Sequence, residues 1–132
     1  MKYSIDKKEQ YSLVSLGEDK LDASVAPELK SELITMHAEG TRNLILDMGT
    51  VKYSDSSGLS ALLVGNRIFR EDGGTFVMAG LNDHVMKLLK ISQLDSVLSI
   101  VPTTEEAVDS VFLNQIEQDL GDDTKENGNG AA

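Results

Sequence analysis

Apolar and polar residues alternate in two short segments at the start of the chain. Tyr3 and Ile5 alternate with polar residues, and a second segment of this kind runs from Tyr11 to Leu16. Such alternation is typical of strands with one buried face. The residues between the segments, 7–10, are all polar and predict a hairpin connection. We therefore expect the chain to open with a strand hairpin.

A helical pattern follows the hairpin. One apolar stripe recurs at steps of four, four and three: Val25, Leu29, Leu33 and Met36. Residues at these spacings share one face of a helix. Ser24 is a favourable N-cap, Pro27 is tolerated in a first turn, and Gly40 suits the end of a helix. The pattern predicts a helix with its stripe packed on a sheet.

Three further strands are predicted, at residues 43–48, 76–79 and 97–101, the last of them stopped by Pro102. The apolar centre of 43–48 is unbroken, which suggests a strand buried on both faces. Asp47 interrupts the apolar run near the C-terminal end of that strand. Residues 49–54 are expected to form a loop.

Helices are predicted after each of these strands. The first begins around Ser56 or Ser57, and the second is capped by Asn82 or Asp83. Thr103 forms a capping box with a glutamate three residues later and opens the last helix. Four apolar residues are expected on the inner side of that helix: Val108, Val111, Phe112 and Ile116.

The alternation of helices and strands predicts crossover connections and a largely parallel sheet. The fold class is therefore α/β, with a mixed sheet to which the first hairpin adds an antiparallel strand and with helices on at least one face. The apolar pattern vanishes from about Gly121. We expect one domain over residues 1–117 and an acidic, disordered tail over residues 118–132.

The amino-acid composition limits the kinds of partner that the protein is expected to bind. The 132 residues include 22 acidic and 12 basic side chains, for a net charge of −10. This charge disfavours nucleic acid and anionic membranes as partners. The excess acid either keeps the domain soluble or fits a basic protein partner. There is no cysteine, no secretory signal and no apolar run of the length of a membrane span. We expect a cytoplasmic protein.

The candidate site lies at the end of the predicted central strand. In open α/β sheets, function gathers beyond the C-terminal ends of the strands. Asp47 ends one strand, and Asp55, Ser56 and Ser57 follow at the start of a helix. Free backbone N–H groups at a helix start suit an anion. The plain alternative is that these side chains only cap the helix or shape the turn.

Enzymatic readings find little support. A hydrolase nucleophile elbow needs glycine two residues before the serine, but Ser54 and Asp55 stand at those positions. The spacing gives neither His37 nor His84 a catalytic partner. Asp47 and Asp55 could share Mg²⁺, although capping or solvated roles are the simpler reading. We expect no enzyme, cofactor or metal.

The segment Asp55-Ser56-Ser57-Gly58-Leu59 resembles the switch motif of the STAS family, specifically of the bacterial anti-sigma factor antagonists. The resemblance covers about residues 3–115. Its other segments are Leu21-Asp22-Ala23 with Ala26-Pro27-Glu28-Leu29, Leu44-Ile45-Leu46-Asp47 with Val51, Tyr53 and Ser54, and residues 76–81 with Val85, Leu88, Leu89 and Ile91. It implies a mixed sheet of four to five strands, largely parallel, with helices packed mainly on one face.

The resemblance also implies a switch. Ser57 matches the phosphorylated serine of the family, and a kinase that doubles as an anti-sigma factor binds the unphosphorylated form. This binding frees a sigma factor, phosphorylation breaks it, and a phosphatase restores it. The implied partner-binding residues are Asp22, Asp55, Ser56, Gly58 and Leu59, with Asp47 as a further support. We expect a monomer or weak dimer.

Two alternatives stay open. STAS domains also serve in transporters and in lipid-transport or signalling complexes, and a small-ligand sensor for a nucleotide or lipid would place a pocket near Val51 and Tyr53. The segment Gly17-Glu18-Asp19-Lys20 is slightly longer than the family's usual entry. Because this loop is expected to face the partner, the identity of the partner stays open.

Overall fold

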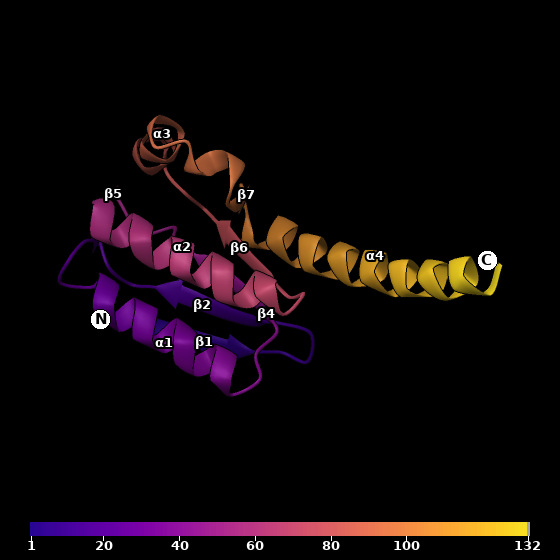
Figure 1. The fold of residues 1–132 in the computed structure, drawn as a ribbon. Coiled ribbons are helices and arrows are strands. Elements are labelled where there is room, and N and C mark those ends of the chain that lie inside the picture. Colours follow the sequence, from indigo (N-terminus) through magenta and orange to yellow (C-terminus); the bar gives the residue numbers. More distant parts are fainter. Residues whose placement is uncertain (132) are drawn as a thin grey trace.

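Five strands form one mixed sheet in the order β1-β2-β4-β6-β7 (Figure 1). Their bounds are Tyr3–Lys7 for β1, Ser12–Leu16 for β2, Asn43–Asp47 for β4, Thr75–Ala79 for β6 and Ser99–Val101 for β7. β1 is antiparallel to β2, and the other neighbouring strands are parallel. This computed structural model describes the backbone of residues 1–131 and the side chains of residues 1–120. The predicted hairpin and largely parallel sheet are confirmed.

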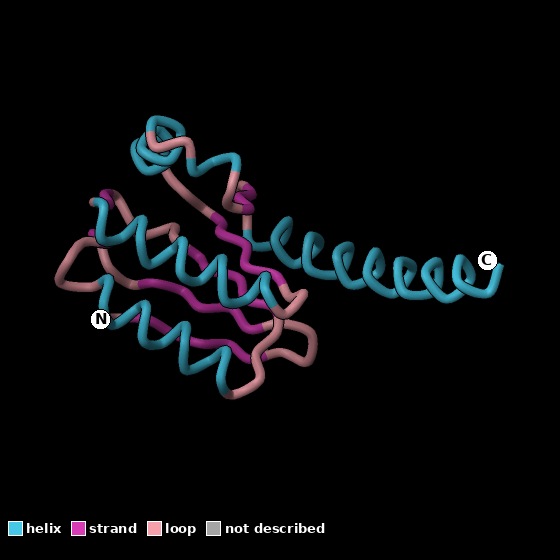
Figure 2. Tube along the Cα trace, in the orientation of Figure 1, coloured by secondary structure: helices cyan, strands magenta, loops and turns pink. Residues whose placement is uncertain are grey.

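Helices cover both faces of the sheet. Their bounds are Ala26–Ala38 for α1, Ser56–Glu71 for α2, Asp83–Ile91 for α3, Leu94–Ser96 for the short 3-10 helix η1 and Thr104–Ala131 for α4. α1 and α2 lie side by side on one face (Figure 2). α4 packs against β4, β6 and β7 from the opposite face. The helices are thus mainly on one face, as predicted, with α4 on the other.

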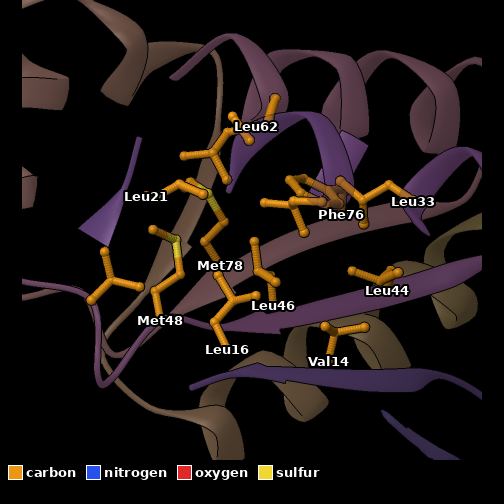
Figure 3. Close-up of a cluster of buried hydrophobic side chains, with 14 of the residues drawn as sticks. Val14, Leu16, Leu21, Leu33, Leu44, Leu46, Met48, Leu62, Phe76 and Met78 are labelled. Carbon is orange, nitrogen blue, oxygen red and sulfur yellow. The ribbon is translucent and has the colours of Figure 1, made fainter. Parts of the chain in front are cut away.

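Side chains of the central strands alternate between two apolar clusters. Leu44 and Leu46 point toward α1 and α2 and are completely buried (Figure 3). Ile45 points the other way and packs with Ala107 and Val111 of α4. Since successive residues of a strand face opposite sides, a strand covered on both sides has an unbroken apolar run. The predicted two-sided burial of this strand is confirmed.

The apolar stripe of α1 is buried as predicted, with Leu29 and Leu33 completely shielded from solvent. Its N-cap was predicted wrongly. The cap position is Val25, without a side-chain cap bond, and Ser24 instead donates its hydroxyl to Asp22 Oδ1 at 2.6 Å. The Asp22 carbonyl accepts the N–H of Val25, at 3.0 Å. The turn that Asp22 makes therefore sets the start of the helix.

Two predicted caps are present. Asn82 Oδ1 accepts the N–H of Val85 at 2.8 Å at the start of α3. Thr103 Oγ1 accepts the N–H of Glu106 at 3.1 Å at the start of α4. Such bonds satisfy N–H groups that have no partner within the helix. Both helix starts therefore follow from local sequence.

The inner side of α4 differs from its prediction. Val111 is buried and Val108 partly so, but Phe112 is 42% exposed and Ile116 is 54% exposed. At 100° per residue, Ile116 lies about 140° around the helix from Val111, so both cannot face the sheet. The small residue Ala107 occupies the inner position instead.

α4 continues as helix to Ala131, through the segment for which a disordered tail was predicted. The side chains of residues 121–132 lie outside the described residues. The division into a domain over residues 1–117 and a disordered tail therefore stays a prediction. Within the part of the chain that the structure describes, no helix combines the length and apolar character needed to cross a membrane.

Candidate functional site

A second, two-stranded sheet positions the candidate site. β3 (Lys20–Leu21) pairs in parallel with β5 (Tyr53–Ser54). The N–H of Asp55 also donates to the carbonyl of Leu21, at 3.3 Å. This small sheet ties the loop before α1 to the loop before α2. Sequence reasoning placed residues 53–54 in a loop, because a strand of two residues has too few positions to show alternation.

Asp55 is the N-cap of α2. Its Oδ1 accepts the N–H of Ser57 at 2.9 Å and that of Gly58 at 3.1 Å. The reading of Asp55 as a cap is confirmed. The simple capping role considered for Ser56 and Ser57 is wrong, because both lie inside the first turn of the helix. The two serine hydroxyls are therefore not needed to start the helix.

Gly58 is buried where α2 meets the two-stranded sheet. A Cβ at this position would lie 2.3 Å from the carbonyl oxygen of Leu21 and 2.3 Å from Ser54 Oγ. A side chain of any size therefore collides with backbone and hydroxyl. Gly58 therefore allows the first turn of α2 to pack closely against the two-stranded sheet.

Ser56 is exposed and Ser57 is half-buried. Both line a shallow hollow between the first turns of α1 and α2, whose other lining residues are Ala23, Ala26, Pro27, Lys30 and Ser60. Lys30 was missed from the sequence. It is distant in the chain from Ser57, and the signal available was that both residues occupy the N-terminal halves of helices expected on the same face.

Asp22 borders the same region. Its Oδ1 accepts the Ser24 hydroxyl at 2.6 Å and the Ser24 N–H at 3.0 Å. These two hydrogen bonds hold the pKa of Asp22 below its ordinary value, because they stabilise the charged carboxylate. Asp22 therefore keeps its negative charge at neutral pH, on the loop that leads into α1.

The remaining candidates, Leu59 and Asp47, make contacts that support the local structure. Leu59 is half-buried against the larger apolar cluster. Asp47 Oδ1 accepts the N–H of Gly49 at 2.9 Å and so shapes the turn after β4. No group of three or more potential metal-binding side chains occurs among the residues with described positions. The candidate site therefore presents the serine hydroxyls and the charged side chains of Asp22 and Lys30 at the surface of the domain.

The two histidines have other contacts. His37 Nε2 lies 2.5 Å from Asp72 Oδ2, where α1 and α2 end, so it is at the opposite ends of these helices from Ser57. His84 stacks on Tyr53, with ring centroids 6.1 Å apart. Tyr53 is exposed, while Val51 is buried in the core.

Residues 4–102 match the family described as "Mlab, STAS domain". This match covers most of the chain, including both strands of the small sheet and the switch-like turn. The chain belongs to the STAS domain family. The resemblance drawn from the sequence motif is confirmed at this level.

Two relatives of this STAS domain carry functional names. BtrV of Bordetella bronchiseptica, a candidate anti-sigma factor antagonist, is 28% identical over 107 residues, covering 81% of this chain and 91% of that protein. The anti-sigma-B factor antagonist of Staphylococcus aureus is 27% identical over 86 residues, covering 65% of this chain and 80% of that protein.

Solved structures show the same fold. An anti-sigma factor antagonist from Mycobacterium paratuberculosis has a TM-score of 0.74 at 21% identity, covering 83% of this STAS domain and 92% of that chain. The antagonist SpoIIAA, in its unphosphorylated form, has a TM-score of 0.66 at 18% identity, covering 83% and 97%. Its phosphorylated form has a TM-score of 0.65 at 20% identity, covering 83% and 99%.

Proposed function

We propose that this STAS domain is an anti-sigma factor antagonist whose partner binding is switched off by phosphorylation of Ser57. The observation that carries the proposal is the place of Ser57: the first turn of α2, beside an open hollow, on a helix that Asp55 already caps. The names of the two relatives support the class of partner. SpoIIAA, which has the same fold, is known in unphosphorylated and phosphorylated forms.

A phosphate on Ser57 can be added with little effect on the fold. The backbone N–H groups of Ser57 and Gly58 already bond to Asp55, so the helix start does not depend on the serine hydroxyl. The phosphate adds about −1.5 to −2 charges at neutral pH. Those charges would stand next to Asp55 on one side and share the hollow with Lys30 on the other. The surface then becomes strongly negative while the backbone stays in place.

The partner proposed is an anti-sigma factor that is also a serine kinase, with a phosphatase that restores the unphosphorylated form. Its docking face would include Ser56, Leu59 and Asp22, which lie around the start of α2 and the loop before α1. In the unphosphorylated state these residues offer a mixed polar and apolar surface of modest charge. Phosphorylation would weaken binding because charge must be desolvated at the interface.

The test uses an anti-sigma factor kinase from the same organism. After incubation with kinase and ATP, mass spectrometry should find phosphate on Ser57, and the Ser57→Ala variant should remain unlabelled. Ser56→Ala is the matched control and should be labelled like the wild type. Binding measured by calorimetry should survive in Ser57→Ala and weaken in Ser57→Asp. Phosphate found on Ser56 alone would refute the assignment of the switch residue.

A further inference from the structure

One face of α4 is fixed to the body of the domain. Ala107 and Val111 are buried against the sheet. Further along the helix, Gln118 Oε1 accepts a hydrogen bond from Arg42 Nη2 at 2.8 Å, and the Gln118 amide donates to the carbonyl of Gly73. These residues recur at steps of four and seven, so they share one side of the helix. That side is the inner face of α4.

The opposite side of the helix is apolar and largely exposed. We call it the outer apolar stripe, and it consists of Phe112, Leu113, Ile116 and Leu120. Their exposed fractions are 42%, 58%, 54% and 59%. The rings of Phe112 and Tyr11 form a T-shaped contact with centroids 6.5 Å apart, which anchors the start of the stripe. From there α4 extends away from the sheet (Figure 1).

The spacing of the outer apolar stripe is that of a helix contact surface. Phe112, Ile116 and Leu120 recur at steps of four, and Leu113 lies three residues before Ile116. From Phe112 to Leu120 the stripe extends about 12 Å along the axis, at 1.5 Å per residue. Several large apolar side chains in one exposed row are typical of an interaction site, whereas isolated ones are ordinary. A partner helix can pack along such a row with its own apolar side.

The charged residues beside the outer apolar stripe indicate which charge a partner helix should carry. Between Thr104 and Leu120, α4 contains no basic residue and these acidic ones: Glu105, Glu106, Asp109, Glu117 and Asp119. At 100° per residue, Glu117 and Asp119 border the outer apolar stripe on its two sides. A second copy of this helix would bring like charges together along the seam, which disfavours self-association. Lysine or arginine on the partner would instead form ion pairs with both borders.

We propose that the outer apolar stripe of α4 binds an amphipathic helix of a partner protein, with leucine-like residues on its apolar face and Lys or Arg beside them. The site is separate from the Ser57 surface, because it lies on the helix of the opposite face of the sheet. The domain would then engage two partners at once, one at the start of α2 and one along α4.

The experiment measures fluorescence anisotropy of a labelled helical peptide with the full chain. The probe is a Leu and Lys peptide of about 18 residues, or five turns, with leucines at steps of three and four. A second peptide carries Glu at every Lys position. We expect the Lys peptide to bind and the Glu peptide to bind at least about tenfold more weakly, with the affinity for the Lys peptide falling as salt rises.

Variants locate the binding site. The double variant Ile116→Ser with Leu120→Ser should weaken binding by about tenfold or more, as truncation of central contacts does. Ile34→Ser is the matched control, because Ile34 is also an exposed isoleucine of a helix, at 49%, and should bind like the wild type. Glu117→Lys with Asp119→Lys should also lose about tenfold. Circular dichroism would verify that each variant is folded.

Three outcomes overturn the proposal. One is failure of the Lys peptide to bind the wild-type chain. Another is equal binding by the stripe variant and the wild type, which would place the peptide elsewhere on this acidic protein. The third is a dimer in sedimentation velocity that the double variant abolishes, since the occupant would then be a second copy of the chain.

Discussion

Replacing Gly58 by alanine tests whether the close contact between the start of α2 and the two-stranded sheet contributes to the stability of the fold. The new Cβ would lie 2.3 Å from the Leu21 carbonyl oxygen and from Ser54 Oγ, where ordinary contacts begin at 3.4 Å. The two elements must therefore separate by about 1 Å. The Leu21 carbonyl also accepts the N–H of Asp55, so the shift would strain that bond and the pairing of β3 with β5.

Three terms set the magnitude of the Gly58→Ala effect. Overpacking costs about 1–3 kcal/mol, and weakening one buried hydrogen bond costs about 1 kcal/mol. Alanine in place of glycine inside a helix gains about 1 kcal/mol. The free energy of unfolding should therefore fall by about 1–3 kcal/mol. The sign is the important point, because helix propensity alone predicts stabilisation.

Urea unfolding followed by circular dichroism gives the measurement. Ser60→Ala is the control, since Ser60 is an exposed residue of the same helix and its substitution should stay within about 0.5 kcal/mol. If Gly58→Ala were as stable as the wild type or more so, the close contact with Leu21 would not limit the fold, and the reasoning would be refuted.

Three further predictions follow from the packing and the hydrogen bonds. Leu33→Ala should lower the free energy of unfolding by about 2–5 kcal/mol, whereas the exposed neighbour Ile34→Ala should change it little, as urea titration would show. Asp55→Ala removes the cap of α2 and should cost about 1 kcal/mol, while Asp55→Asn should retain most of it. Asp22 has a lowered pKa, so its stabilising contribution is present above its unfolded pKa and is lost as the pH falls through the lower, folded value. The difference in thermal midpoint between wild type and Asp22→Ala should therefore shrink as the pH falls below the ordinary pKa of an aspartate, and a difference that grows on acidification would contradict the role of the Ser24 contacts.

The sequence predicted the elements whose pattern is long enough to repeat. The stripe of α1 and the two-sided burial of β4 follow from periodicity, because each has several positions that must be apolar for the same reason. α4 was located correctly but its inner side was not. Phe112 and Ile116 are apolar without being buried, and periodicity cannot distinguish a core face from an exposed interaction face.

The parts of the site that the sequence did not predict depend on contacts between distant segments. The pairing of β3 with β5 joins Leu21 to Ser54 through backbone atoms, which leave no trace in side-chain pattern. Lys30 reaches the hollow beside Ser57 because α1 and α2 lie side by side. The motif could be located from the sequence, whereas the residues that surround it could be identified only from the packing of the helices in the structure.

The structure divides the Asp-Ser-Ser-Gly motif into residues that hold the turn and residues that present chemistry. Asp55 and Gly58 hold it, the first by capping α2 and the second by allowing contact with Leu21. The side chains of Ser56 and Ser57 take no part in either task, and both residues line the hollow between α1 and α2. Substitutions of Asp55 or Gly58 should therefore change stability and partner binding together, whereas Ser57→Asp should weaken binding at constant stability. The proposed switch would therefore alternate between two charge states without refolding, because the groups that fix its geometry are not the group that would be modified.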